Sequence, residues 1–214
     1  MLKVWGRTTS VNVQKVLWAL DEIGQAFEQT DVGGPFGGLD TPEFGSLNPA
    51  RRIPVLQDGD FALWESGAIV AYLLETYGGD RVGPRNGRER ALSLQWTDWC
   101  QFQLYRDIIV DCFMPLVRVP AAERNQSQVA AGARRAGEQL AILDAHLSGR
   151  TFIVGDRLTA ADVVIGSLMH RYVTMPIERP ALANVARWHQ GLMDRHGFRT
   201  YIMVDWESMK VPGA

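Results

Sequence analysis

Residues 53–70 read IPVLQDGDFALWESGAIV, and the predicted fold class follows from this stretch. Two short apolar runs, 54–57 and 61–64, flank Asp58-Gly59-Asp60, a pattern that predicts a β-hairpin with a tight turn. Helical spacing follows, with apolar side chains at Ile69, Val70, Leu73, Leu74 and Tyr77. The stretch therefore predicts two antiparallel strands and then a helix.

The residues before this stretch predict a strand, a helix and a second strand. Residues 2–5 form a short apolar alternation, and residues 13–20 follow helical apolar spacing up to a stop at Gly24. A second strand is expected at 27–32, and the glycine-rich segment 33–38 predicts a loop without regular structure. Strand, helix, strand, strand, strand, helix is the order of a small α/β domain.

The remainder of the chain predicts a separate helical domain. Residues 79–87 are rich in glycine and polar residues, so we expect a linker there between an α/β domain at 1–78 and an all-α domain at 88–214. Residues 88–117 form one long helical stretch. Further on, Thr159 with Asp162 three residues later resembles a capping box before an apolar run.

Composition excludes several classes of protein. The chain has 214 residues, of which 46% are hydrophobic and 21% charged, as in an ordinary globular protein. Its formal net charge of −2 gives no electrostatic basis for binding nucleic acid. Apolar runs stay far below the roughly 20 residues that span a bilayer, so no membrane partner is expected. The first residues, MLKVWGR, lack a signal core, and we expect a cytoplasmic protein.

Cysteine and histidine patterns predict neither a disulfide nor a metal site. Twelve residues separate Cys100 from Cys112, which is about 18 Å along a straight helix and too far for a disulfide. The sequence contains no Cys-x-x-Cys or His-Glu-x-x-His motif, Walker loop or Gly-x-Ser-x-Gly elbow. Four histidines lack ligand spacing: His146, His170, His189 and His196.

Three short motifs carry polar groups suited to binding a small anion or zwitterion. Residues 8–12, TTSVN, lie between the first strand and the first helix, where hydroxyls either cap the helix or help its N-terminus hold an anion. Arg51 and Arg52 precede Ile53-Pro54, and they are either solvated charges or anchors for a carboxylate. Glu65-Ser66 pairs an acid with a helix start, which suits a ligand carrying both an ammonium and a carboxylate.

Together these motifs resemble the glutathione transferase superfamily, in particular its bacterial, theta-like serine-type enzymes. Ile53-Pro54 is similar to the family's Val/Ile-cis-Pro, residues 65–69 to its Glu/Gln-Ser-x-Ala-Ile signature, and residues 159–162 to its C-terminal capping motif. The stretch from Arg179 to Trp188 also resembles the family. The resemblance covers essentially the whole chain and implies a thioredoxin-like N-terminal domain, an all-α C-terminal domain and a cis Pro54.

The resemblance also implies an activity and the residues that carry it. The enzyme would convert the thiol of glutathione, its co-substrate, into a thiolate that attacks small, largely apolar electrophiles in detoxification. Ser10 matches the catalytic hydroxyl, with Thr9 and Asn12 as alternates. Arg52, Ile53, Glu65 and Ser66 match glutathione-binding positions. The family is usually a two-fold homodimer.

Electrophile specificity is the least predictable feature. Phe102, Arg106 and Phe113 on the long helix are candidates for an electrophile pocket between the domains, although core packing explains such side chains as well. A glutathione-dependent isomerase or peroxidase, or a non-catalytic glutathione-binding regulatory protein on the same scaffold, are the alternative functions.

Overall fold

A four-stranded mixed sheet forms the N-terminal part of the computed structural model, which describes residues 1–213. The strands lie in the order β2-β1-β3-β4. β1 (Leu2–Trp5) is parallel to β2 (Phe27–Thr30) and antiparallel to β3 (Val55–Asp58), which pairs with β4 (Phe61–Trp64). The predicted hairpin is therefore present, while the second strand ends two residues earlier than expected.

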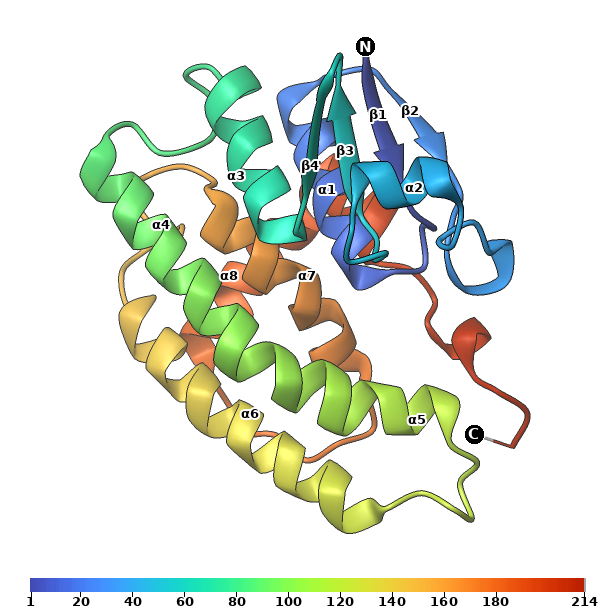
Figure 1. The fold of residues 1–214 in the computed structure, drawn as a ribbon. Helices are drawn as coiled ribbons and strands as arrows, with labels where there is room; N and C mark the ends of the chain where they lie inside the picture. Colours follow the sequence, from blue (N-terminus) through green and yellow to red (C-terminus); the bar gives the residue numbers. More distant parts are fainter. Residues whose placement is uncertain (214) are drawn as a thin grey trace.

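Helices cover both faces of the sheet (Figure 1). Val4 and Leu56 point into the main core, which they share with α1 (Val11–Ile23) and α3 (Ser66–Tyr77). Their neighbours Trp5 and Val55 point to the opposite face, where they pack on Phe44. Because side chains alternate along a strand, two adjacent apolar residues require cover on both faces.

The helix that covers the second face, α2 (Pro42–Leu47), is absent from the sequence prediction, which has only loop between residues 33 and 53. Thr41 caps this helix by accepting a hydrogen bond from the Phe44 N–H at 3.2 Å, and Pro42 occupies the first helical position. A proline just after a capping residue is the signal that would have predicted it. The glycine-rich loop also contains a short 3₁₀ turn, Gly34–Phe36, where only loop is predicted.

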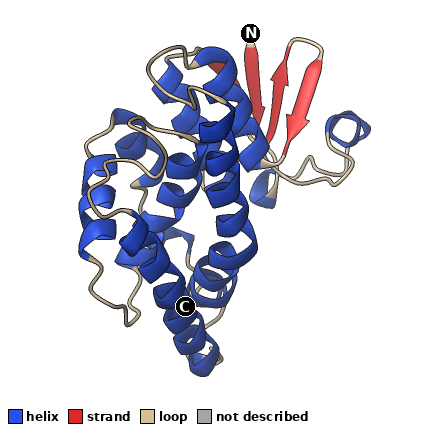
Figure 2. Ribbon diagram, turned by 90° about the vertical axis from the view of Figure 1, so that its left-hand side faces the viewer, coloured by secondary structure: helices blue, strands red, loops and turns tan. Residues whose placement is uncertain are grey.

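The C-terminal part is helical, as predicted, and no strand occurs between residue 79 and residue 213. After α3 ends at Tyr77, α4 (Gly87–Trp99) continues through π-helical stretches at Cys100–Leu104 and Arg106–Phe113 into α5 (Met114–Arg118). The other long helices are α6 (Gln126–His146), α7 (Ala160–Thr174) and α8 (Ala183–Met193). Figure 2 shows these helices packed beside the smaller sheet.

A buried carboxylate fixes the start of α7. Asp162 accepts hydrogen bonds from the Thr159 N–H at 2.9 Å, the Ile153 N–H at 2.9 Å and the Trp188 indole at 3.0 Å. Thr159 and Asp162 form the predicted capping box. One side chain therefore joins the helix start, the preceding loop and α8.

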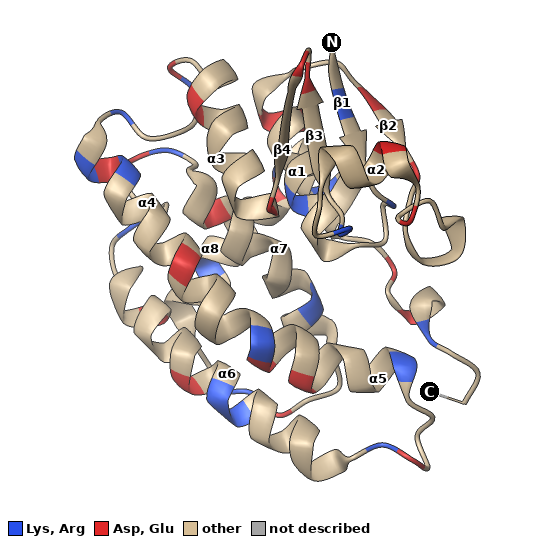
Figure 3. Cartoon of the chain, viewed as in Figure 1, with Lys and Arg blue, Asp and Glu red and all other residues tan. Residues whose placement is uncertain are grey.

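Charges of both signs are interspersed over the two parts of the molecule (Figure 3). Within residues 1–213, no helix is both long and apolar enough to cross a membrane. Cys100 and Cys112 are free and buried, and burial raises their thiol pKa values to about 12 and about 11. Neither cysteine is therefore a ready nucleophile.

Candidate functional site

A cavity of about 200 Å³ lies where the sheet domain meets the long helix. It brings together Arg52, Ile53, Glu65 and Ser66, four binding residues that the sequence predicts from two separate motifs, and also the alternate Asn12. Its complete lining is Asn12, Asn48, Arg52, Ile53, Pro54, Glu65, Ser66, Gln101 and Tyr105. A short run before β3, the starts of α1 and α3, and the π-helical region therefore all contribute to one site.

The loop before β3 places Ile53 and Pro54 in the lining of this cavity. The Ile53–Pro54 peptide bond is cis in the structure, as the resemblance implies. Asn48, which is buried, donates to the Arg52 carbonyl at 2.8 Å and accepts from the Ala50 N–H at 2.9 Å, so it ties the loop to itself. Asn48 is a site residue that the sequence analysis misses, because its contribution depends on this loop geometry.

The two adjacent arginines have different positions. Arg51 has a φ of 52°, and its guanidinium donates to the Leu39 carbonyl at 2.7 Å and the Thr41 carbonyl at 3.1 Å. These bonds hold the segment before α2, so the Arg51 side chain has a structural role. Arg52 lines the cavity, and of the two it alone is placed to reach a ligand carboxylate.

The pair Glu65-Ser66 combines backbone strain with a helix start. Glu65 has a φ of 72°, a left-handed conformation that is costly for a residue with a side chain. Its side chain is exposed and makes no capping bond among the described residues, and Ser66 begins α3 with only 2% of its surface exposed. Free N–H groups at this helix start favour a carboxylate, and the neighbouring acid favours an ammonium.

The hydroxyls at the start of α1 lie beside the cavity but do not line it. Ser10 occupies the N-cap position of α1, and its hydroxyl makes no capping hydrogen bond within residues 1–213. Thr8 and Thr9 are exposed, and the Thr9 carbonyl is 3.4 Å from Arg171 Nη2. Of the three candidates for contact with the thiol, Asn12 alone belongs to the lining.

A buried lysine, absent from the predicted site residues, lies beneath the site. Lys15 is fully buried in α1, and its ammonium donates to Asn12 Oδ1 at 2.9 Å and to Gln101 Oε1 at 3.2 Å. Burial lowers the pKa of this ammonium from its ordinary 10.5 to about 8. A lysine on the apolar side of the first helix, one turn after Asn12, is the signal that points to it.

The long helix presents a different face to the cavity from the one predicted. Gln101 and Tyr105 line it, whereas the electrophile-pocket candidates Phe102, Arg106 and Phe113 do not. Phe102 is 78% exposed, and Phe113 packs between Trp206 and the Arg171 guanidinium. Gln101 and Tyr105 both line the cavity, whereas Phe102 and Arg106, each one position later, are turned to a different face of the helix. Whether the three candidates contact an electrophile stays a prediction.

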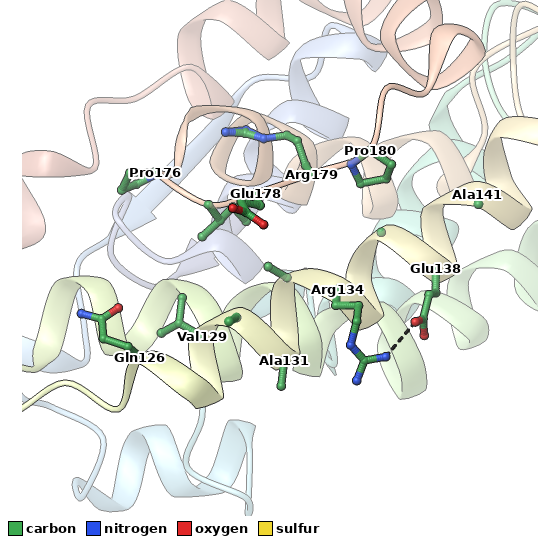
Figure 4. A pocket seen from close by; sticks show the side chains of 14 residues that line it. Gln126, Val129, Ala131, Arg134, Glu138, Ala141, Pro176, Glu178, Arg179 and Pro180 are labelled. Carbon is green, nitrogen blue, oxygen red and sulfur yellow. Dashed lines mark hydrogen bonds and ion pairs between the residues drawn. The ribbon is translucent and has the colours of Figure 1, made fainter.

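A larger groove of about 1110 Å³ lies between α6 and residues 176–180 (Figure 4). It shares no lining residue with the first cavity. Three of its charged side chains have partners within the chain, since Arg134 pairs with Glu138 at 2.8 Å and Arg179 donates to three main-chain carbonyls. No cluster of metal-ligating side chains occurs in residues 1–213. The chemistry therefore concentrates at the smaller cavity.

Comparison with known proteins agrees with this location. The family model "Glutathione S-transferase, N-terminal domain" matches residues 1–75, and "Glutathione S-transferase, C-terminal domain" matches residues 105–196. The chain is 34% identical over 209 residues to glutathione S-transferase GstB of Escherichia coli (strain K12), with 95% of this chain and 99% of the relative covered. It is 31% identical over 200 residues to glutathione S-transferase 4 of Zea mays, covering 91% and 88%.

Solved structures give the same result. The theta class glutathione S-transferase of Xanthomonas axonopodis pv. citri with glutathione bound superposes with a TM-score of 0.89 and 39% identity, covering 95% of this chain and 98% of the other. Its apo form superposes with a TM-score of 0.80. Both domains and their arrangement are therefore shared with these proteins.

Proposed function

The chain belongs to the glutathione S-transferase superfamily and is a glutathione transferase, and from that premise we propose how its residues bind glutathione and activate the thiol. Glutathione is the co-substrate. The observation that carries the proposal is the convergence of Ile53, Glu65 and Ser66 on one cavity beside the start of α1.

Each end of the tripeptide has a complementary group in this cavity. The γ-glutamyl end carries an ammonium and a carboxylate, which fit the Glu65 side chain and the Ser66 hydroxyl with the α3 N-terminus. The Ile53 main chain pairs with the cysteinyl residue, and Arg52 faces the glycyl carboxylate. This orientation directs the sulfur toward the first turn of α1.

At that position two donors stabilise the thiolate: the Ser10 hydroxyl and the Asn12 amide. A free thiol with a pKa of about 8.5 is only about 3% ionised at pH 7. Lowering this pKa by about two units makes about three-quarters of it thiolate, roughly a 25-fold gain. The proton leaves to solvent, and a sulfur lone pair forms a bond to the electrophilic carbon of a small, largely apolar substrate. In a substitution the leaving group departs with its bonding electron pair, and in an addition the π electrons move to the adjacent atom, which then takes up a proton.

Removing the Glu65 carboxylate tests the binding mode. We expect Glu65→Ala to weaken glutathione binding, measured by calorimetry, by about 2 kcal/mol or more, the scale of a charge-assisted hydrogen bond. The matched control is Asp60→Ala, an exposed acid in the hairpin turn at the other end of β4. Unchanged affinity in folded Glu65→Ala protein would remove Glu65 from the site.

We also propose a cellular location and an oligomeric state for the enzyme. We place it in the cytoplasm as a two-fold homodimer that acts in detoxification, in keeping with the family resemblance. The exposed apolar side chains Phe61 and Trp64 on the edge strand β4 support an assembly through this region.

A further inference from the structure

Lys15 is a buried cation whose hydrogen-bond acceptors, in the described part of the chain, are two neutral amide oxygens. Its ammonium lies 2.9 Å from Asn12 Oδ1 and 3.2 Å from Gln101 Oε1, and both residues line the glutathione cavity. The same ammonium is 5.4 Å from the centre of the Tyr105 ring. It therefore lies directly beneath the cavity, with solvent excluded.

The charges around Lys15 leave this region positive. From α7, the Arg171 guanidinium is 1% exposed, and two of its nitrogens, Nε and Nη1, have no partner within residues 1–213. The remaining neighbours are Glu65 at the start of α3, whose side chain is exposed, and the Cys100 thiol and Tyr105 on the long helix. Burying an ammonium without an ionic partner is costly. An anion in the adjoining cavity offsets part of that cost.

Lys15 also determines which way the Asn12 amide faces. An ammonium only donates, so the Asn12 atom beside it must be the carbonyl oxygen, and the Ser66 hydroxyl lies 3.4 Å from the same oxygen. The amide nitrogen is then turned away from Lys15. Because Asn12 lines the cavity while its oxygen is held by Lys15, we infer that its N–H groups are the part of the amide that faces the ligand.

We propose that Lys15 is a positioning residue for thiol activation: it holds the Asn12 amide with its N–H groups toward the sulfur of bound glutathione and supplies a buried countercharge to the thiolate. The inference rests on the proposed function, since it requires glutathione in this cavity. Thiolate stabilisation then depends on Lys15, a residue that does not itself line the cavity.

The test is the pH titration of the thiolate absorbance of bound glutathione in full-length protein. Lys15→Met removes the donors and the charge while keeping the approximate length of the side chain, and it leaves the Asn12 and Gln101 oxygens without this donor. We expect the titration midpoint to rise by about one unit or more, a tenfold loss of thiolate below the midpoint. Glutathione affinity at a pH where the thiol stays protonated should change less than about twofold.

Two further variants separate positioning from a general structural effect. Asn12→Asp replaces the amide donor with a carboxylate that Lys15 can pair with, so the fold is retained while the midpoint rises. In an Asn12→Leu background, Lys15→Met should shift the midpoint by about half a unit or less, because residues that act through one another are non-additive. Lys15→Gln keeps a neutral donor to Asn12 and should recover part of the loss.

The measurements distinguish failure of the proposed role of Lys15 from failure of the proposed glutathione-binding mode. If wild-type protein binds glutathione with a lowered thiol pKa and neither folded Lys15→Met nor Asn12→Asp raises the midpoint, the role of Lys15 is overturned and the proposed function stands. Full additivity of the Lys15 and Asn12 effects also overturns it. Should Lys15→Met fail to fold, an unchanged midpoint in Asn12→Asp decides against the proposal. If the wild-type protein binds no glutathione, the proposed binding mode itself fails.

Discussion

At the scale of single residues, the site depends on groups left without partners by the fold. The Ser10 hydroxyl makes no capping bond in the described residues, and Glu65 has a strained φ of 72°. A side chain that neither caps a helix nor packs in the core contributes little to stability. We therefore expect substitutions at these positions to change binding or chemistry more than folding.

Replacing the Ser10 hydroxyl should change the thiol and leave affinity nearly intact. In Ser10→Ala the thiolate titration midpoint of bound glutathione should rise by about one unit or more, since each unit is about 1.4 kcal/mol of lost anion stabilisation. Because the thiol pKa is raised, turnover should fall about tenfold near pH 6.5 and less near pH 9.

Thr9→Val is the control for this prediction, since Thr9 is exposed and adjacent to Ser10. It should leave the midpoint where it is in the wild type. A raised midpoint in Thr9→Val with none in Ser10→Ala would assign the hydroxyl to Thr9. If neither variant moves the midpoint, the hydroxyl mechanism is wrong and Asn12 or the helix N-terminus carries the stabilisation.

At the scale of elements, α7 organises the helical domain through its first turn. Asp162 is fully buried and accepts bonds from the preceding loop, from the helix start and from Trp188 of α8. Its neighbour Gly166 permits close packing, because a Cβ there would lie 2.6 Å from Leu192 and 3.2 Å from Trp18 of α1. The first two turns of one helix thus connect both domains.

Asp162→Ala should lower the free energy of unfolding by about 3 kcal/mol or more, because it leaves several buried donors unpaired. Chemical denaturation measures this directly. Glu138→Ala on α6 is the comparison: its exposed i,i+4 pair with Arg134 should be worth at most about 0.5 kcal/mol. Equal effects for the two variants would mean that the carboxylate is not central to the fold.

At the scale of the whole molecule, the α/β domain supplies the binding residues and the helical domain closes the site. Gln101 and Tyr105 reach the cavity from the long helix, and α7 brings Arg171 to the turn before α1. Arg195 donates to Glu22 of α1 at 2.6 Å, a second polar link across the same interface. The relative position of the domains is therefore part of the site.

Assembly is testable on the intact chain. We expect light scattering at micromolar concentration to give twice the chain mass of 23.9 kDa. Exposed apolar side chains occur on β4 at Phe61 and Trp64 and on α4 at Leu92 and Leu94, as expected if the sheet domain of one subunit faces the helical domain of its partner.

Trp64→Glu should shift the mass toward one chain, and Ile142→Glu on α6, also an exposed apolar position, should not. A wild-type mass of 23.9 kDa would reject the homodimer.

Local sequence patterns predict those elements of the structure that depend only on neighbouring residues. Strand alternation, helical spacing, the Asp-Gly turn and the Thr159–Asp162 capping box each depend on a few neighbouring residues, and the structure contains them. Helix α2 was missed because it is six residues long and has too few apolar positions to show a period. Its existence follows from the second face of the sheet, which needs cover.

The composition of the cavity depended on the tertiary structure. The motifs at 52–53 and 65–66 indicate a ligand. Asn12, Gln101 and Tyr105 line the same cavity only because the long helix is rotated in one particular way against the sheet domain. Helical periodicity predicts that a helix has a buried face, but a rotation by one residue position exchanges Phe102 for Gln101 at the site. Lys15 appears in the sequence as an ordinary charge. Packing alone makes it a buried cation beneath the site, because that packing excludes water from its ammonium.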